Sequence, residues 1–124
     1  MDVIVDKLTK SFEGHKAVDS ISFKAKRGEV LGLLGPNGAG KTTTMKILSG
    51  YLLPERGNIN FGDYSIWKQA GKIKKVIGYL PEHNPLYSEM NVIDFLFFIG
   101  KLQDIPKYKI TARVLDMIRL CGLD

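Results

Sequence analysis

The chain has 124 residues, of which 44% are apolar, and a formal net charge of +5, so it can form at most one small domain. Most of its lysines are expected on a solvated surface, with a patch for nucleic acid or anionic lipid as the alternative. No segment is dense enough in Lys and Arg, interleaved with aromatic residues, to indicate direct nucleic-acid binding. The longest apolar run, Phe95 to Ile99, is far below the roughly 20 residues of a membrane span. The N-terminus lacks the apolar core of a signal peptide. A single cysteine fits a reducing compartment.

The first third of the chain predicts β-structure. Val3 to Val5 begin a strand, and residues 17–23 alternate enough to form a second one. A turn at residues 27–29 leads into the apolar run Val30–Leu34, which is typical of a buried parallel strand.

A glycine-rich motif follows that run. It matches the phosphate-cradling pattern G-x-x-x-x-G-K-[ST] and consists of Gly35, Pro36, Asn37, Gly38, Ala39, Gly40, Lys41, Thr42 and Thr43. The glycines let several backbone N–H groups converge on anionic oxygens, Lys41 can reach phosphates, and the Thr42 hydroxyl suits a magnesium ion. A helical pattern that ends at Gly50 comes next, so strand, loop and helix provide the context of a phosphate site. The alternative is a glycine-rich turn with a surface lysine.

The rest of the chain predicts a short strand and then mostly helices. Residues 58–61 form that strand, Gln69 to Lys75 a short basic helix, and Val76 to Leu80 another strand. Asn91 is placed to cap a helix from Val92 to Leu102 that is apolar almost all round, as in helices that are buried or docked on a partner. A last amphipathic helix begins near Lys107 and ends before Gly122; one face carries Ile110, Val114, Met117, Ile118 and Cys121, so Cys121 is expected in the core.

These segments together resemble the ATP-binding subunit of ABC transporters. The likeness spans the whole chain but only the first half of such a subunit, and it is carried by residues 8–12, 17–23, 28–29, 35–43 and 77–82. It implies an α/β fold of the P-loop NTPase class and ABC ATPase type, truncated, with a small antiparallel β region. Residues 1–124 would form a partial nucleotide-binding domain: 1–90 the β region and P-loop core, 91–124 the start of the helical subdomain.

The resemblance implies ATP and Mg²⁺ as cofactors and gives three further residues a role. Phe12 matches the aromatic residue that stacks on adenine, and Val18 matches the apolar position beside the base. Glu82 stands where the family usually has a glutamine that contacts magnesium and the attacking water. A carboxylate can bind magnesium but adds negative charge and cannot donate a hydrogen bond, so a solvated loop carboxylate is an equal alternative for Glu82. For Phe12 the less favoured alternative is a core or surface-loop aromatic residue.

The implied function is that of a subunit that binds Mg-ATP to power export through a separate transmembrane permease subunit. Residues 80–87 are similar to an export-type subgroup that includes gliding-motility subunits. Such a subunit lies in the cytoplasm, peripheral on the inner face of the membrane, and pairs with a second ATP-binding subunit; no nucleic-acid partner is expected. Thr42 and Glu82 are the metal-ligand candidates.

Catalysis by these 124 residues stays open. The family's glycine-rich signature, its acidic strand-end motif with the catalytic glutamate and its switch histidine have no counterpart here, so efficient hydrolysis and high stability are not expected. Two alternatives are a non-catalytic fragment that docks on a membrane partner and a soluble ABC ATPase acting on ribosomes or DNA. A GTPase is disfavoured because no Asn-Lys-x-Asp motif occurs.

Overall fold

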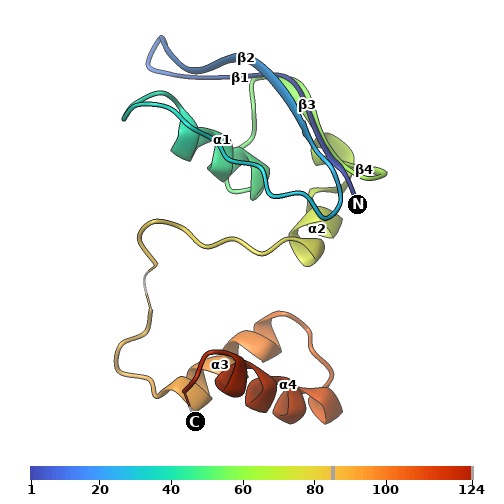
Figure 1. The fold of residues 1–124 in the computed structure, drawn as a ribbon, viewed down its shortest axis with the longest axis vertical. Helices are drawn as coiled ribbons and strands as arrows, with labels where there is room; N and C mark the ends of the chain where they lie inside the picture. The colour runs from blue at the N-terminus through green and yellow to red at the C-terminus, as the bar shows by residue number, and fades with distance from the viewer. Residues whose placement is uncertain (85, 124) are drawn as a thin grey trace. The chain divides into compact units, whose positions relative to one another are not determined.

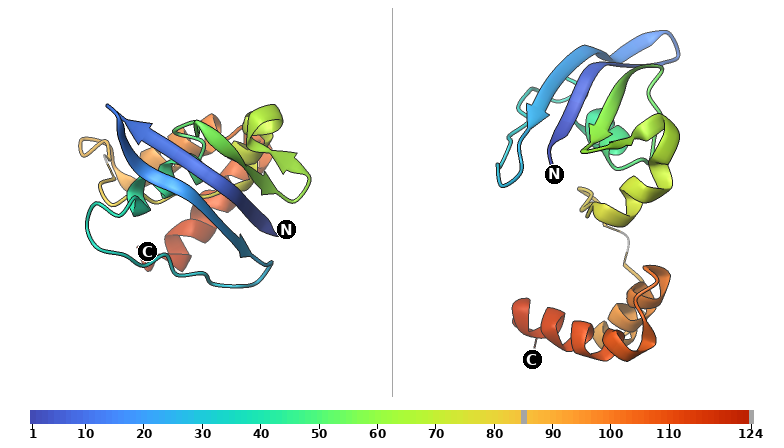
Figure 2. Two further views of the ribbon diagram at one scale, coloured as in Figure 1. Left: turned by 90° about the horizontal axis from the view of Figure 1, so that it is seen from above. Right: turned by 90° about the vertical axis from the view of Figure 1, so that its right-hand side faces the viewer.

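The computed structural model describes residues 1–84 and 86–123, which divide into two compact units, Met1–Tyr79 and Leu80–Asp124. Figures 1 and 2 show the elements of both units. The first unit contains β1 (Val3–Phe12), β2 (His15–Ala25), α1 (Lys41–Leu48), β3 (Arg56–Phe61), β4 (Tyr64–Ser65) and α2 (Ile66–Val76). The second contains α3 (Val92–Leu102) and α4 (Lys107–Leu120). The strands predicted at the N-terminus, at 17–23 and at 58–61 are therefore confirmed.

A four-stranded antiparallel sheet organises the first unit, with strand order β2-β1-β3-β4. β1 and β2 form a hairpin that turns through Glu13 and Gly14, both with positive φ. Asp2 fastens the start of this sheet, because its carboxylate accepts a hydrogen bond from the Arg27 N–H at 3.0 Å and pairs with the Lys24 ammonium at 3.0 Å. These two contacts hold the pKa of Asp2 below its ordinary value.

The core of this unit lies between one face of the sheet and the helices α1 and α2 (Figure 2). Leu8 and Ile59 from the sheet and Ile47 from α1 have no exposed surface, and Ile66 and Ile73 bring α2 into the same cluster. Burying one such side chain contributes about 1.5–3 kcal/mol. This packing fixes α1 under the sheet, and with α1 the glycine-rich loop that precedes it.

The strands predicted at Val30–Leu34 and Val76–Leu80 are not formed, so both predictions are wrong. α2 extends to Val76 and no strand follows it, and residues 30–34 are irregular. A parallel strand exists only when neighbouring strands satisfy its backbone groups, and the described residues supply no such neighbour for either run. The two runs instead line an apolar cavity of about 240 Å³ through Leu31, Leu33, Ile77 and Tyr79.

The second unit is a helical pair. The Asn91 side chain accepts a hydrogen bond from the Asp94 N–H at 2.9 Å and begins α3 at the predicted residue. Gly100 is buried and allows close approach of α4, because a Cβ there would lie 2.8 Å from Cγ1 of Ile110. On α4, Ile110, Val114 and Ile118 are buried, which confirms the predicted apolar face.

One expectation about this pair fails. Cys121 is exposed rather than packed in the core, because α4 ends at Leu120 and Cys121 only caps it. Among the residues of α3, all of them described, Gly100 alone is buried, and Ile93 and Leu102 are 52% and 62% exposed. The helix is therefore not buried within its own unit, and its docking on a partner stays a prediction. In the part of the chain that the structure describes, no helix is long and apolar enough to cross a membrane.

Candidate functional site

The glycine-rich loop enters α1 through Gly40, which adopts the left-handed conformation with φ 90° and ψ 7°. A Cβ at this position would collide with the carbonyl oxygen of Ala17 and lie 3.2 Å from Cγ2 of Val18. Only glycine tolerates both the positive φ and this close approach. The sequence motif predicts the glycine but carries no signal for its contact with β2, which fixes the N-terminus of α1 beside Val18.

The N-terminus of α1 offers free hydrogen-bond donors. The helix has no acidic residue in its first turn, and within the described residues no side chain caps its start. Its first hydrogen bond runs from the Thr44 N–H to the Gly40 carbonyl at 2.9 Å. Helical geometry therefore leaves the N–H groups of Lys41, Thr42 and Thr43 without intrahelical acceptors. These N–H groups and the helix dipole favour an anion at this position.

Lys41 places its positive charge at the loop itself. Its ammonium donates to the carbonyl oxygens of Gly35 and, at 2.7 Å, Pro36, and the Ala39 N–H donates to the Pro36 carbonyl at 3.1 Å. The loop is thus folded back on the first residue of α1. The loop carbonyls are the lysine's partners here, and their hydrogen bonds are exchangeable for those of a phosphate oxygen.

Phe12 and Val18, the two residues expected beside the adenine base, differ in how much of their side chains is exposed. Phe12 ends β1 and is 45% exposed, with the Lys10 ammonium 5.6 Å from the ring centroid. Its ring is accessible to a planar group, which stacking requires. Val18 is only 4% exposed and belongs to the core cluster, so the structure joins it to the loop through Gly40 and leaves little of its side chain free. The role of Phe12 and Val18 beside a base stays a prediction.

The donor set for magnesium is limited. Thr42 is exposed, and its hydroxyl is engaged by no described residue, which fits an ion that keeps most of its water ligands and takes one protein oxygen. Glu82 is an exposed residue of the second unit, and its role as a ligand stays a prediction. In residues 1–84 and 86–123, no group of three His, Cys, Asp or Glu side chains could hold a metal ion. Thr42 is therefore the residue that fits the ion on this structure.

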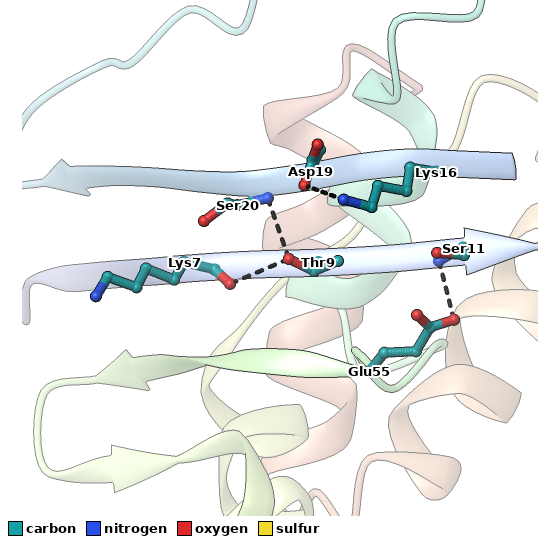
Figure 3. Close-up of polar contacts among 7 residues, drawn as sticks. All are labelled: Lys7, Thr9, Ser11, Lys16, Asp19, Ser20 and Glu55. Carbon is teal, nitrogen blue, oxygen red and sulfur yellow. Dashed lines mark hydrogen bonds and ion pairs between the residues drawn. The ribbon is translucent and has the colours of Figure 1, made fainter.

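A second hollow, of about 560 Å³, is lined by polar residues of β1 and β2 and by the start of β3. Figure 3 shows how its groups engage one another. The Ser20 N–H donates to Thr9 Oγ1 at 3.1 Å, Lys16 pairs with Asp19 at 3.1 Å, and Glu55 accepts from the Ser11 N–H at 3.0 Å. These contacts tie together strands that are irregular in register. The hollow is thus part of the scaffold, and the loop is the candidate site.

Comparison with known proteins shows the family of the chain. Residues 18–124 match the family model described as ABC transporter. The chain is 39% identical to the uncharacterized ABC transporter ATP-binding protein YxlF of Bacillus subtilis. The alignment of 122 residues covers 96% of this chain and 39% of YxlF. It is 36% identical to the linearmycin resistance ATP-binding protein LnrL of the same organism, over 95% of this chain and 38% of LnrL.

A solved structure has the same fold. The chain is similar to the structure of an ATP binding subunit of an ABC transporter, with a TM-score of 0.82 and 26% sequence identity. The alignment covers 96% of this chain and 50% of that subunit. The chain therefore has the mixed α/β fold of this class, and it spans half or less of the length of YxlF, LnrL and this subunit.

Proposed function

The chain belongs to the ABC transporter family, in the ATP-binding part of such transporters, and from this premise we propose that it binds Mg-ATP through residues 35–43. The observation that supports the proposal is the uncapped N-terminus of α1, where free N–H groups and the Lys41 ammonium lie at one glycine-rich loop. A triphosphate is the ligand that this charge and these donors suit.

The groups of this site have separate tasks in the proposal. The N–H groups of the loop and of the first turn of α1 hold the phosphates, and Lys41 exchanges the carbonyls of Gly35 and Pro36 for phosphate oxygens. Thr42 provides one oxygen to the magnesium ion, which neutralises part of the phosphate charge. Phe12 stacks on the base, and Glu82 contacts the ion or senses the membrane partner.

The transport function extends this proposal to the whole subunit. ATP binding and turnover in the complete subunit would drive export through a separate membrane permease, with two ATP-binding subunits acting as a pair on the cytoplasmic face of the membrane. The name of LnrL, a linearmycin resistance protein, supports export as the direction. Efficient hydrolysis is not assigned to these 124 residues, because phosphoryl transfer needs a placed water and charge stabilisation beyond the cradle.

A second candidate function is docking on a membrane partner without catalysis. It is favoured by an apolar groove of about 400 Å³ in the second unit, which is lined among others by Leu86, Tyr87, Phe95 and Met117. A groove of this kind accepts an apolar segment of another protein. Retained binding to a membrane subunit in the absence of any ATP binding would favour this function over the first.

The test measures ATP affinity of the purified chain with and without Mg²⁺, together with released phosphate. Lys41→Ala removes a charged hydrogen-bond donor and should weaken ATP binding roughly tenfold or more, since such a contact contributes about 1.5–3 kcal/mol. Lys46→Ala, on the same helix but in its last turn, is the matched control and should change affinity by less than about twofold. Equal affinity of wild type and Lys41→Ala would refute the phosphate site.

A further inference from the structure

The segment around α2 is strongly and uniformly basic. Residues 64–79 contain four lysines, Lys68, Lys72, Lys74 and Lys75, and no Asp or Glu. All four lysines are exposed, whereas Ile66 and Ile73 are buried against the sheet. α2 thus buries its apolar side and presents cations to solvent. This segment plays no part in the phosphate loop.

Aromatic side chains lie among these cations. Trp67 is 49% exposed, and its indole N–H donates to the Gly57 carbonyl at 2.9 Å, so that the ring is held in a fixed position on the surface. The Lys72 ammonium lies 5.6 Å from the ring centroid of Tyr64. Rings with one polar edge, placed beside lysines, are typical of surfaces that enter the boundary between water and lipid.

The end of α1 extends this surface. An ideal Cβ on Gly50 would lie 3.2 Å from Cε of Lys74, so the Lys74 side chain packs beside the residues that follow α1. There the Lys46 ammonium lies 5.9 Å from the ring centroid of Tyr51, which is 75% exposed. The basic–aromatic surface therefore comprises Lys46, Tyr51, Trp67, Lys68, Lys72 and Lys74.

The charges of this surface are not neutralised by neighbours. Among the described residues, Lys46, Lys68, Lys72 and Lys74 form no ion pair. All of its cations are lysines, which act as mobile point charges, whereas bidentate recognition of nucleic-acid phosphates and bases favours arginine. A diffuse layer of negative headgroups matches lysines and interfacial rings better than a nucleic acid does.

We propose that the basic–aromatic surface docks on anionic phospholipid headgroups. Each lysine near an anionic membrane contributes about 1 kcal/mol, which corresponds to roughly fivefold in affinity per residue. Trp67 and Tyr51 enter the headgroup layer beside the lysines. This membrane contact is made by the protein itself and is separate from any contact with a membrane subunit.

Trp67 is the only tryptophan of the chain, so its fluorescence reports binding directly. The full chain is titrated with vesicles of phosphatidylcholine and with vesicles of equal parts phosphatidylcholine and phosphatidylglycerol, and bound protein is also measured by co-sedimentation. We expect a blue shift of Trp67 emission and binding only with the anionic vesicles, weakened by added salt. Lys68→Gln/Lys72→Gln/Lys74→Gln should weaken binding on the order of a hundredfold.

The matched control removes the same charge elsewhere. Lys101→Gln/Lys107→Gln/Lys109→Gln changes three exposed lysines of the second unit and should leave vesicle binding within about threefold of wild type. Circular dichroism checks that both variants keep the wild-type helix content. Three results would overturn the proposal: no binding or equal binding to the two kinds of vesicle, an equal effect of both triple variants, or tighter binding to polyuridylate than to the anionic vesicles at the same salt.

Discussion

Neighbouring residues of the glycine-rich loop have separate structural roles. Gly40 permits contact with the backbone of β2 and begins α1 in a left-handed conformation. Lys41, the next residue, directs its charge to the carbonyls of Gly35 and Pro36. The motif predicts both residue types from the needs of a phosphate. The structure adds that Gly40 is also a packing residue, which the spacing of the motif does not reveal.

Substitution of this glycine should therefore destabilise the fold as well as the loop. Gly40→Ala places a methyl group against the Ala17 carbonyl at a φ of 90°, and it should lower the free energy of unfolding by more than about 2 kcal/mol. Gly38→Ala is the control, since its φ of 83° is similar but no atom lies within 4 Å of its Cβ. It should cost about 1–2 kcal/mol. Urea titration compares the two; equal costs would show that the contact with Ala17 does not matter.

At the scale of elements, local signals predict the helices and fail at two strands for which the described residues provide no partner. The bounds of α3 follow from Asn91 and the apolar run after it, and these signals lie in the helix or directly before it. The β1–β2 hairpin is equally local. Residues 30–34 and 76–80 have the composition of buried strands, but a strand forms only beside another strand. Composition alone therefore could not predict that they line a cavity.

The α3–α4 pair should depend on one close contact. Ile110 is 6% exposed and packs on Gly100, so Ile110→Ala leaves a cavity and should destabilise the second unit by about 2–5 kcal/mol. Leu115→Ala changes a residue of the same helix that is 49% exposed and should cost less than about 1 kcal/mol. The measurement is amide hydrogen exchange in α3 and α4. Similar exchange rates in the two variants would contradict this account of the packing.

At the scale of the whole molecule, the first unit leaves apolar surface uncovered. Leu31 and Leu33 are 46% and 38% exposed and line the apolar cavity. The chain spans 39% of YxlF and 38% of LnrL, and within it the Lys41 ammonium already contacts the glycine-rich loop at the Pro36 carbonyl. The candidate site could be predicted from sequence because its residues are contiguous. Which residues form the uncovered surface could not, because this depends on which segments find partners.

This surface should make the isolated chain associate. Sedimentation velocity should show an average mass that rises with concentration, because apolar patches of this kind favour contact between copies. Leu31→Gln/Leu33→Gln should reduce this association at the same concentration, whereas Leu115→Gln on α4 should not. A monomeric chain at high concentration with a sharp, cooperative melt would contradict the prediction.

Residue-resolved hydrogen exchange tests whether the loop and the first turn of α1 hold the phosphates of ATP. Amide exchange of residues 37–43 is compared with and without Mg-ATP, in wild type and in Lys41→Ala. We expect slower exchange of these amides with Mg-ATP in wild type and little or no change in the variant. Two results would contradict this phosphate site. One is ATP binding that slows exchange only at the backbone amides of the α2 lysines, and the other is equal protection of residues 37–43 in wild type and Lys41→Ala.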